Sequence, residues 1–342
     1  MARRRKAAVG RSAHSLLKAM TRAVLRVGSA ALKEGLHAAP PSARRPATAK
    51  AVSPAANWTT GMALGAGGPR RYRLYQPSGV RHNERLPLLV MLHGCRQDAE
   101  ALAASSRMNR IAARERFYVL YPEQDLLANA QRCWNWYDTR SGRAQAEVHS
   151  IAAAIDQVSL RHAIDGRRVA LAGISAGAAM AVLLATRHPE RFRAVVMHSG
   201  IAPGVAHSSA SALQAMVGQG VPPSPLPTLA RNVRLPPLLV IHGAADPVVA
   251  PRNGAEAALR WAEREGATRG KPRTVQRGKR YAMTVVDYRQ RSRLVATHCL
   301  IHRLGHAWSG GAGGHAYSDP KGPDASRMIW TFVARQFASP AN

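Results

Sequence analysis

The chain has 342 residues, 46% of them apolar, and a formal net charge of +30. The apolar share suffices for a sizeable core, but no uninterrupted apolar run reaches the roughly 18 residues that a membrane-spanning helix needs. The charge reflects 42 Arg and 7 Lys without a helix-turn-helix, zinc-finger or RNA-binding signature, which disfavours nucleic-acid binding as the main function.

The first fifty residues are strongly basic, with 12 Lys or Arg and one acid, Glu34. Basic residues interrupt the sequence before an apolar h-region can form, so no standard secretory signal is visible. Residues 13–36 have the spacing of a basic amphipathic helix, which could bind an anionic surface or polymer granule; a poorly ordered tail is the alternative. We expect a basic tail and linker at 1–55, disordered or partly helical, before a catalytic domain at 56–342.

From Arg71 onward, short apolar runs alternate with longer helical patterns, which indicates an α/β fold with a mainly parallel sheet flanked by helices. The expected strands are 72–75, 86–92, 118–121, 168–172, 194–198, 238–242, 283–288 and 297–304. The expected helices are 98–115, 144–163, 176–187, 253–265 and 323–337. The proline-containing segment 203–234 is predicted to be a long loop or cap.

The most informative segment is Gly173-Ile174-Ser175-Ala176-Gly177, which joins a predicted strand to a predicted helix. G-x-S-x-G in this strand-turn-helix context is typical of a nucleophilic serine on a tight turn, where the helix start offers N–H groups to a developing oxyanion. Ser175 is therefore the candidate nucleophile. The alternative is that Ser175 only caps the helix.

An activated serine needs a histidine base and a carboxylate that orients it, in the chain order serine, acid, histidine. Asp246 follows the predicted strand 238–242, at the sheet edge where catalytic groups gather in α/β proteins. We expect Asp246 to be the acid, with Asp287 as the spare. The alternative is that Asp246 only turns the chain before Pro247.

Four histidines follow Asp246, and the expected base is His306, on a loop between the last predicted strand and the last predicted helix. His298 and His302 fall within the strand-like run, and His315 is a distant second choice. For the oxyanion hole we expect the backbone N–H groups of Ala176 and of Cys95, which lies in an H-G-C turn after the strand 86–92.

Several longer motifs are characteristic enough to indicate a protein family: L-H-G-C-R-Q-D-A, Y-P-E-Q, A-N-A-Q-R-C-W-N-W, G-I-S-A-G, H-G-A-A-D-P-V-V and G-H-A-W-S-G-G. Together they resemble the polyhydroxybutyrate depolymerase family of esterases, which includes relatives acting on feruloyl and acetyl esters of plant polysaccharides. The resemblance spans roughly Arg71 to Phe337. It implies the α/β-hydrolase fold, catalytic roles for Ser175, Asp246 and His306, and no metal or organic cofactor.

The resemblance also carries expectations about the surroundings of the site. It implies that Trp134, Trp136 and Trp308 wall the substrate cleft, with packing in the core as the alternative. It also implies that Cys95 and Cys133 lie close enough to form a disulfide in an oxidising compartment. Ala178 departs from the family pattern, where a second glycine usually follows the elbow, and its methyl group could restrict bulky acyl groups.

The expected function is that of a serine esterase acting through an acyl-enzyme on polyhydroxybutyrate or its oligomers. A feruloyl or acetylxylan esterase is the alternative, and a basic granule- or nucleic-acid-associated binding protein is the alternative of another class. The resemblance to secreted depolymerases implies an extracellular location, whereas the lack of a visible signal leaves a cytoplasmic or granule-associated one open.

Overall fold

The computed structural model describes residues 58–81, 83–202, 204–219 and 233–339, which belong to one compact unit. The basic tail expected at 1–55 lies outside these residues, as does part of the predicted loop 203–234. Within the described residues, no helix is both long and apolar enough to cross a membrane.

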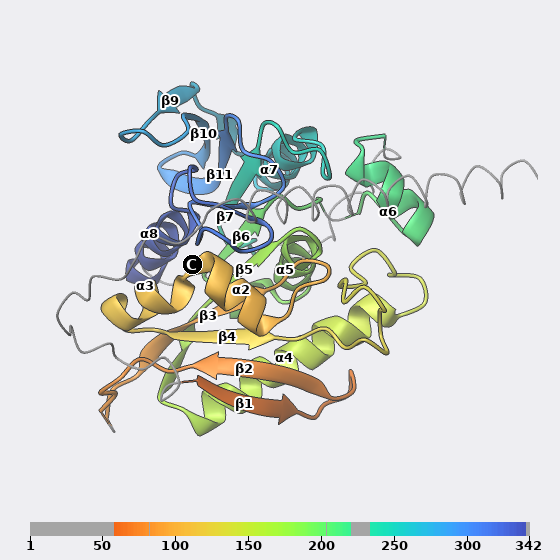
Figure 1. The fold of residues 1–342 in the computed structure, drawn as a ribbon, viewed down its shortest axis with the longest axis vertical. Coiled ribbons are helices and arrows are strands. Elements are labelled where there is room, and N and C mark those ends of the chain that lie inside the picture. Colours follow the sequence, from red (N-terminus) through yellow and green to blue (C-terminus); the bar gives the residue numbers. More distant parts are fainter. Residues whose placement is uncertain (1–57, 82, 203, 220–232, 340–342) are drawn as a thin grey trace, which may run out of the picture. The chain divides into compact units, whose positions relative to one another are not determined.

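One sheet organises the described part of the chain (Figure 1). Its strand order is β1-β2-β4-β3-β5-β6-β7-β11-β10-β8, with β9 paired to β10. The strands from β4 through β3, β5, β6 and β7 to β11 are parallel, and the pairs at both ends of the sheet are antiparallel. The strands are β1 (Trp58–Ala63), β2 (Arg70–Tyr75), β3 (Leu86–Leu92), β4 (Tyr118–Pro122), β5 (Ile164–Ile174), β6 (Ala194–His198), β7 (Leu238–Gly243), β8 (Thr268–Arg269), β9 (Arg273–Val275), β10 (Met283–Gln290) and β11 (Arg293–Ile301).

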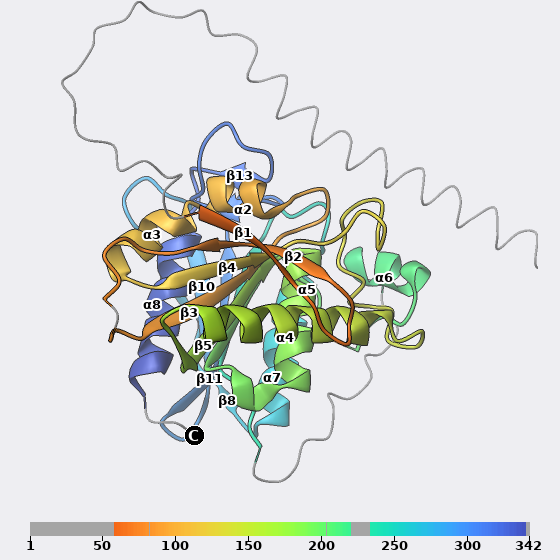
Figure 2. The same cartoon turned by 90° about the horizontal axis from the view of Figure 1, so that it is seen from below.

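Helices cover both faces of the sheet (Figure 2). The helices α4 (Arg143–Arg161), α5 (Ala176–Arg187) and α7 (Arg252–Arg264) pack on one face, and α2 (Ala99–Ser106), α3 (Met108–Glu115) and α8 (Ala325–Ala338) pack on the other. Strand β3 is buried along its whole length because alternate side chains enter the two cores: Leu88 and Val90 enter the first, Leu89 and Met91 the second. This two-sided burial explains the continuous apolar run in the sequence.

The sequence predicted one helix at 98–115, but the structure contains two. Arg107 adopts a left-handed conformation (φ 55°) between α2 and α3 and ends the first helix. Its guanidinium donates hydrogen bonds to the carbonyls of Gly310 and Gly311, at 2.6 and 3.2 Å. A tertiary contact 203 residues away therefore accompanies the break, and local helix propensity could not reveal it.

Further differences concern elements that the sequence left unassigned, among them the short strands β8 and β9, or placed elsewhere. The predicted loop 203–234 contains a helix, α6 (Ser209–Met216), which begins with a capping box at Ser208. The edge strand β1 was not predicted. Strand β11 ends at Ile301 rather than 304, and a short pair, β12 (Trp308–Ser309) with β13 (Ser318–Asp319), follows it.

Candidate active site

The candidate catalytic residues lie at one edge of the sheet because each follows the carboxyl end of a parallel strand. Ser175 follows β5, Asp246 follows β7 and His306 follows β11, while Cys95 lies in the turn after β3. These strands are parallel to one another within the sheet. Segments separated by up to 211 positions in the sequence are thereby gathered where open α/β sheets hold their ligands.

Ser175 lies on a sharp turn between β5 and α5, with φ 57° and ψ −123°. Its neighbours are glycines because the turn leaves no room for a Cβ: one added at Gly177 would lie 2.2 Å from the carbonyl oxygen of Leu92, and one at Gly173 would lie 2.3 Å from that of Gly177. A positive φ at a residue other than glycine is a strained conformation of the kind found at functional sites. The G-x-S-x-G pattern thus has a steric cause in this fold.

The H-G-C turn lies directly beside this serine. A Cβ added at Gly94 would lie 3.4 Å from the Cβ of Ser175, so the two segments are close neighbours. In the part of the chain that the structure describes, the backbone N–H groups of Cys95 and Ala176 donate no hydrogen bond. Two unpaired donors flanking a serine hydroxyl can bind an oxyanion.

His93 holds the H-G-C turn in place. Its Nε2 accepts a hydrogen bond from the backbone N–H of Gln124 at 3.0 Å, so the ring proton is on Nδ1, which donates to the carbonyl of Gly94 at 2.8 Å. Burial lowers the pKa of His93 to about 4, which keeps this neutral tautomer at neutral pH.

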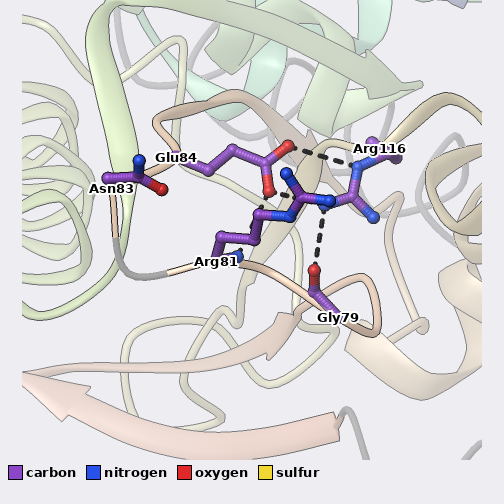
Figure 3. Close-up of a pocket in the computed structure, with 5 residues that line it drawn as sticks. All are labelled: Gly79, Arg81, Asn83, Glu84 and Arg116. Carbon is purple, nitrogen blue, oxygen red and sulfur yellow. Dashed lines mark hydrogen bonds and ion pairs between the residues drawn. The ribbon is translucent and has the colours of Figure 1, made fainter.

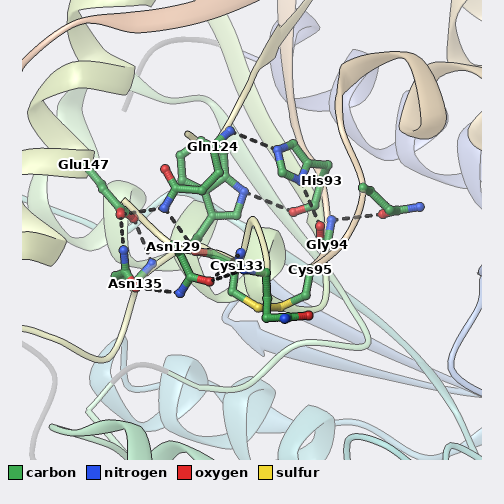
Figure 4. Close-up of a disulfide and its surroundings, with 11 residues drawn as sticks. His93, Gly94, Cys95, Gln124, Asn129, Cys133, Asn135 and Glu147 are labelled. Carbon is green, nitrogen blue, oxygen red and sulfur yellow. Dashed lines mark hydrogen bonds between the residues drawn. A yellow bond between two sulfur atoms is a disulfide. The ribbon is translucent and has the colours of Figure 1, made fainter. Parts of the chain in front are cut away.

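A buried polar network lies beside the same turn and supports it (Figure 4). One carboxylate oxygen of Glu147 accepts hydrogen bonds from the side-chain amides of Gln124 and Asn135, both at 2.6 Å, and the other accepts from the Asn135 backbone at 2.8 Å. Burial raises the pKa of Glu147 against the opposing effect of these hydrogen bonds. Gln124 and Asn135 lie in motifs that carry the family resemblance, but the sequence indicates no role for either residue, and Glu147 carries no local signal.

A disulfide joins Cys95 of the H-G-C turn to Cys133 of the A-N-A-Q-R-C-W-N-W segment (Figure 4). The two Cα atoms are 4.2 Å apart, and 38 positions separate the cysteines in the sequence. The bond ties the H-G-C turn to the loop between β4 and α4. Cys299 is buried in β11 as a free thiol.

Asp246 and His306 form a buried pair. His306 Nδ1 lies 2.8 Å from Asp246 Oδ2, and the other carboxylate oxygen accepts the backbone N–H groups of Val248 and Val249, both at 2.9 Å. The Asp246 side chain has no exposed surface. Burial raises its pKa, but the hydrogen bond from His306 and the neighbouring charges outweigh that effect, and the pKa is lowered overall. Asp246 is therefore ionised at neutral pH and can orient His306.

Two other histidines, neither of them a candidate from the sequence, lie close to this pair. His242 Nε2 is 3.0 Å from the carbonyl of Val249 and 3.5 Å from Asp246 Oδ2, and His198 ends the neighbouring strand β6. Both are fully buried, and burial lowers the pKa of each, to about 3 for His198. His198 is marked in the sequence only by its position at the end of a predicted strand, whereas His242 also begins the motif H-G-A-A-D-P-V-V.

For two of the three tryptophans expected to wall the cleft, the structure contradicts that expectation. Trp134 and Trp308 are 0% and 1% exposed, and their indole N–H groups donate to the His93 carbonyl and to Ser326 Oγ. Both rings lie inside the protein, and their N–H groups already have partners there. The two tryptophans therefore support the loops of the site and do not face a substrate. Trp136, 8% exposed, packs edge-to-face on Tyr137, and its contact with substrate remains an expectation.

The remaining candidates lie apart from the Asp246 and His306 pair. Asp287 on β10 accepts hydrogen bonds from Arg273 and Thr297, at 2.8 and 2.7 Å. His298 is buried within β11, and His302 lies beyond that strand, 3.0 Å from Thr284 Oγ1. His315 is exposed between β12 and β13.

Ala178 does not narrow the site as its departure from the family pattern suggested. It is fully buried on α5, and a Cβ added at Gly200 would lie 2.7 Å from its methyl group. The methyl group therefore packs toward Gly200 inside the protein.

A cavity of about 440 Å³ lies elsewhere, between the loop before β3 and the end of α3 (Figure 3). Arg116 contacts Glu84 at 2.6 Å and the Gly79 carbonyl at 3.1 Å, and the hydrogen bond from Arg116 lowers the pKa of Glu84. None of the candidate catalytic residues lines this cavity, which we interpret as a surface depression stabilised by an ion pair.

The fold and part of the sequence match known proteins. The strand order and the serine turn define the α/β-hydrolase fold, and this fold matches the acetyl xylan esterase from Aspergillus awamori with a TM-score of 0.62 at 18% identity, over 81% of this chain and 99% of that one. Residues 70–270 match the family described as Esterase PHB depolymerase, and the chain belongs to this family.

Two relatives illustrate the range of that similarity. Poly(3-hydroxyalkanoate) depolymerase C of Paucimonas lemoignei is 36% identical over 185 residues, which are 52% of this chain and 44% of that protein. Feruloyl esterase B of Neurospora crassa is 27% identical over 215 residues, 56% of this chain and 70% of that protein. The match thus spans less than half the length of the depolymerase.

Proposed function

We propose that the protein hydrolyses carboxylic esters with Ser175 as nucleophile, His306 as base and Asp246 as the acid that orients it. The observation that carries this proposal is the buried 2.8 Å contact between His306 and Asp246, at the same sheet edge as the strained turn of Ser175. His306 Nδ1 donates to Asp246, which leaves Nε2 free to accept the proton of the serine hydroxyl.

The reaction then proceeds in two halves. Ser175 Oγ attacks the ester carbonyl while His306 takes its proton, and the N–H groups of Cys95 and Ala176 stabilise the oxyanion. His306 returns the proton to the departing alcohol, which leaves an acyl-enzyme. Water activated by His306 attacks this intermediate and releases the acid.

The proposed substrate is a polyhydroxyalkanoate, such as polyhydroxybutyrate, or its oligomers. The 36% identity to a poly(3-hydroxyalkanoate) depolymerase supports this choice over feruloyl and acetylxylan esters, for which the identities are 27% or lower. A panel of hydroxybutyrate oligomers, feruloyl esters and acetylated xylan, compared by kcat/KM, tests the ranking. A higher kcat/KM for either plant ester would contradict it.

The nucleophile is tested with Ser175→Ala. We expect this variant to lose hydrolysis of p-nitrophenyl butyrate by ~10⁴-fold or more and to lose labelling by a fluorophosphonate probe, because triad losses cost that much in turnover. Labelling at the wild-type rate would show that another residue is the nucleophile.

We further propose that the basic tail, residues 1–55, serves location and not chemistry. Its charge supports attraction to an anionic surface or polymer granule. The domain lacking 1–55 should hydrolyse a soluble ester at an unchanged rate, while the full chain alone should sediment with acidic vesicles and detach as salt is raised. Equal sedimentation of the two proteins would refute the targeting role.

A further inference from the structure

His198 contacts both loops that carry the proposed catalytic residues. It is the last residue of β6 and has no exposed surface. Its backbone carbonyl accepts a hydrogen bond from the N–H of Ser175 at 2.9 Å. Its ring Nε2 accepts one from the N–H of Ser309, three positions after His306, at 3.2 Å. A single residue thus connects the serine turn to the histidine loop.

The ring of His198 is fixed in one orientation and one tautomer. Donation from Ser309 requires an unprotonated Nε2, so the ring proton is on Nδ1, which lies 3.2 Å from Ser199 Oγ. The ring stacks on Trp308, with centroids 5.2 Å apart and planes inclined by 17°. Burial lowers the pKa of His198 to about 3, so Nε2 stays an acceptor at neutral pH.

The histidine loop is anchored on two sides. On its leading side, the Leu304 carbonyl accepts the N–H of Ala245 at 3.0 Å, which ties the loop to the segment that carries Asp246. On its trailing side, Ser309 binds His198 and, through Oγ, the carbonyl of Pro323 at 2.6 Å. Of these anchors, the bond from Ser309 to His198 is the one that connects the loop to Ser175, because the His198 carbonyl also accepts the Ser175 N–H.

We propose that His198 is a positioning residue that sets the placement of His306 relative to Ser175. This inference rests on the proposed function, in which His306 activates Ser175. Full burial keeps the His198 side chain from touching substrate, so it acts through the two loops. Removing the Nε2 acceptor leaves the contact between His306 and Asp246 in place, and also the bond from Ser309 Oγ to Pro323, but it removes the anchor that ties the trailing side of the loop to β6. A misplacement of about 1 Å lowers turnover by roughly 100-fold while substrate binding is retained.

The test compares three substitutions of His198 with a matched control. His198→Phe keeps the aromatic contact with Trp308 but loses the acceptor. His198→Gln places an amide oxygen near the position of Nε2, whereas the shorter His198→Asn places it near Nδ1, out of reach of Ser309. Val196→Ala, two residues earlier on the same buried face of β6, removes packing without touching either loop. For each protein, kcat and KM for p-nitrophenyl butyrate, the rate of fluorophosphonate labelling and Tm are measured.

We expect His198→Phe and His198→Asn to lower kcat and the labelling rate by roughly 10- to 100-fold with KM within about threefold of wild type, and His198→Gln to recover most of the loss. Val196→Ala should lower Tm without lowering kcat. If His198→Phe does not fold, the comparison of Gln with Asn decides. Wild-type kcat in the folded Phe or Asn variant, or a Gln variant no better than Asn, would overturn the positioning role alone. A wild-type protein that neither hydrolyses esters nor reacts with the phosphonate would contradict the proposed function and this inference with it.

Discussion

His306 Nδ1 and Asp246 Oδ2 lie 2.8 Å apart inside the protein, although 60 positions separate the two residues in the sequence. The Asp246 side chain is fully buried and also accepts two backbone N–H groups, so contacts other than the one with His306 hold its orientation. The loops after β7 and β11 can hold this pair because their strands are neighbours in the sheet.

The first prediction separates the two candidate acids. Asp246→Asn should lower kcat by ~10³ to 10⁴, because an amide at this position no longer holds His306 in the tautomer that accepts the serine proton. Asp287→Asn should retain most of the activity, since Asp287 contacts Arg273 and Thr297 instead. Steady-state kinetics of both variants show which carboxylate is the acid. A greater loss of kcat for Asp287→Asn would identify Asp287.

The second prediction concerns the glycine after the serine. Gly177→Ala should lower activity by about 100-fold or more, or prevent folding, because its Cβ would lie 2.2 Å from the Leu92 carbonyl oxygen and 2.3 Å from that of His93. Gly166→Ala is the matched control, since a Cβ there meets nothing within 4 Å. Soluble yield and ester turnover are compared for the two variants. Wild-type activity in Gly177→Ala would contradict the close approach of α5 to the end of β3.

A third prediction addresses the disulfide. The double variant Cys95→Ala, Cys133→Ala should lose roughly 2–4 kcal/mol of unfolding free energy, because the bond closes a long loop and restricts the unfolded chain. It should also turn over esters more slowly, since the bond holds the turn that carries the proposed oxyanion donor Cys95. Denaturant unfolding is measured with and without dithiothreitol. The reductant should destabilise the wild type and leave the double variant unchanged, and equal sensitivity of both would show that the bond does not stabilise the fold.

The fourth prediction is that acid destabilises the fold well above the pKa of ordinary carboxylates. Burial lowers the pKa of His93, His198 and His298 to about 4, 3 and 4. Each takes up a proton on unfolding below pH 6.5, so the free energy of unfolding falls as pH is lowered from 6.5 to 4, by up to about 1.4 kcal/mol per pH unit for each histidine. Glu147 has a raised pKa and acts in the opposite direction, but it is a single carboxyl group, and burial lowers the pKa of His242 as well as that of these three histidines.

Urea unfolding across this pH range measures the slope, and His298→Phe provides its control. His298 Nε2 is buried without a hydrogen-bond partner among the described residues, so an apolar ring can replace it. The variant should show a slope that is smaller by up to about 1.4 kcal/mol per pH unit. An unfolding free energy that does not change between pH 6.5 and 4 would contradict the burial of neutral histidines.

The sequence by itself determined the fold class, most strands and helices, and the strand-turn-helix context of Ser175. These features depend on local periodicity and on glycine spacing around a tight turn, which a single chain segment carries within itself. The chain order of serine, acid and histidine also indicated Asp246 and His306 as candidates without any spatial information.

Only the tertiary structure decided how those segments meet. It enclosed Trp134 and Trp308, which the sequence assigned to the cleft, and it broke the predicted helix at Arg107 through a contact with Gly310 and Gly311. It also revealed the roles of Glu147 and His198, whose partners lie in segments distant in the sequence. Burial and long-range hydrogen bonds depend on which strands become neighbours in the sheet, and no local pattern in the sequence records that order.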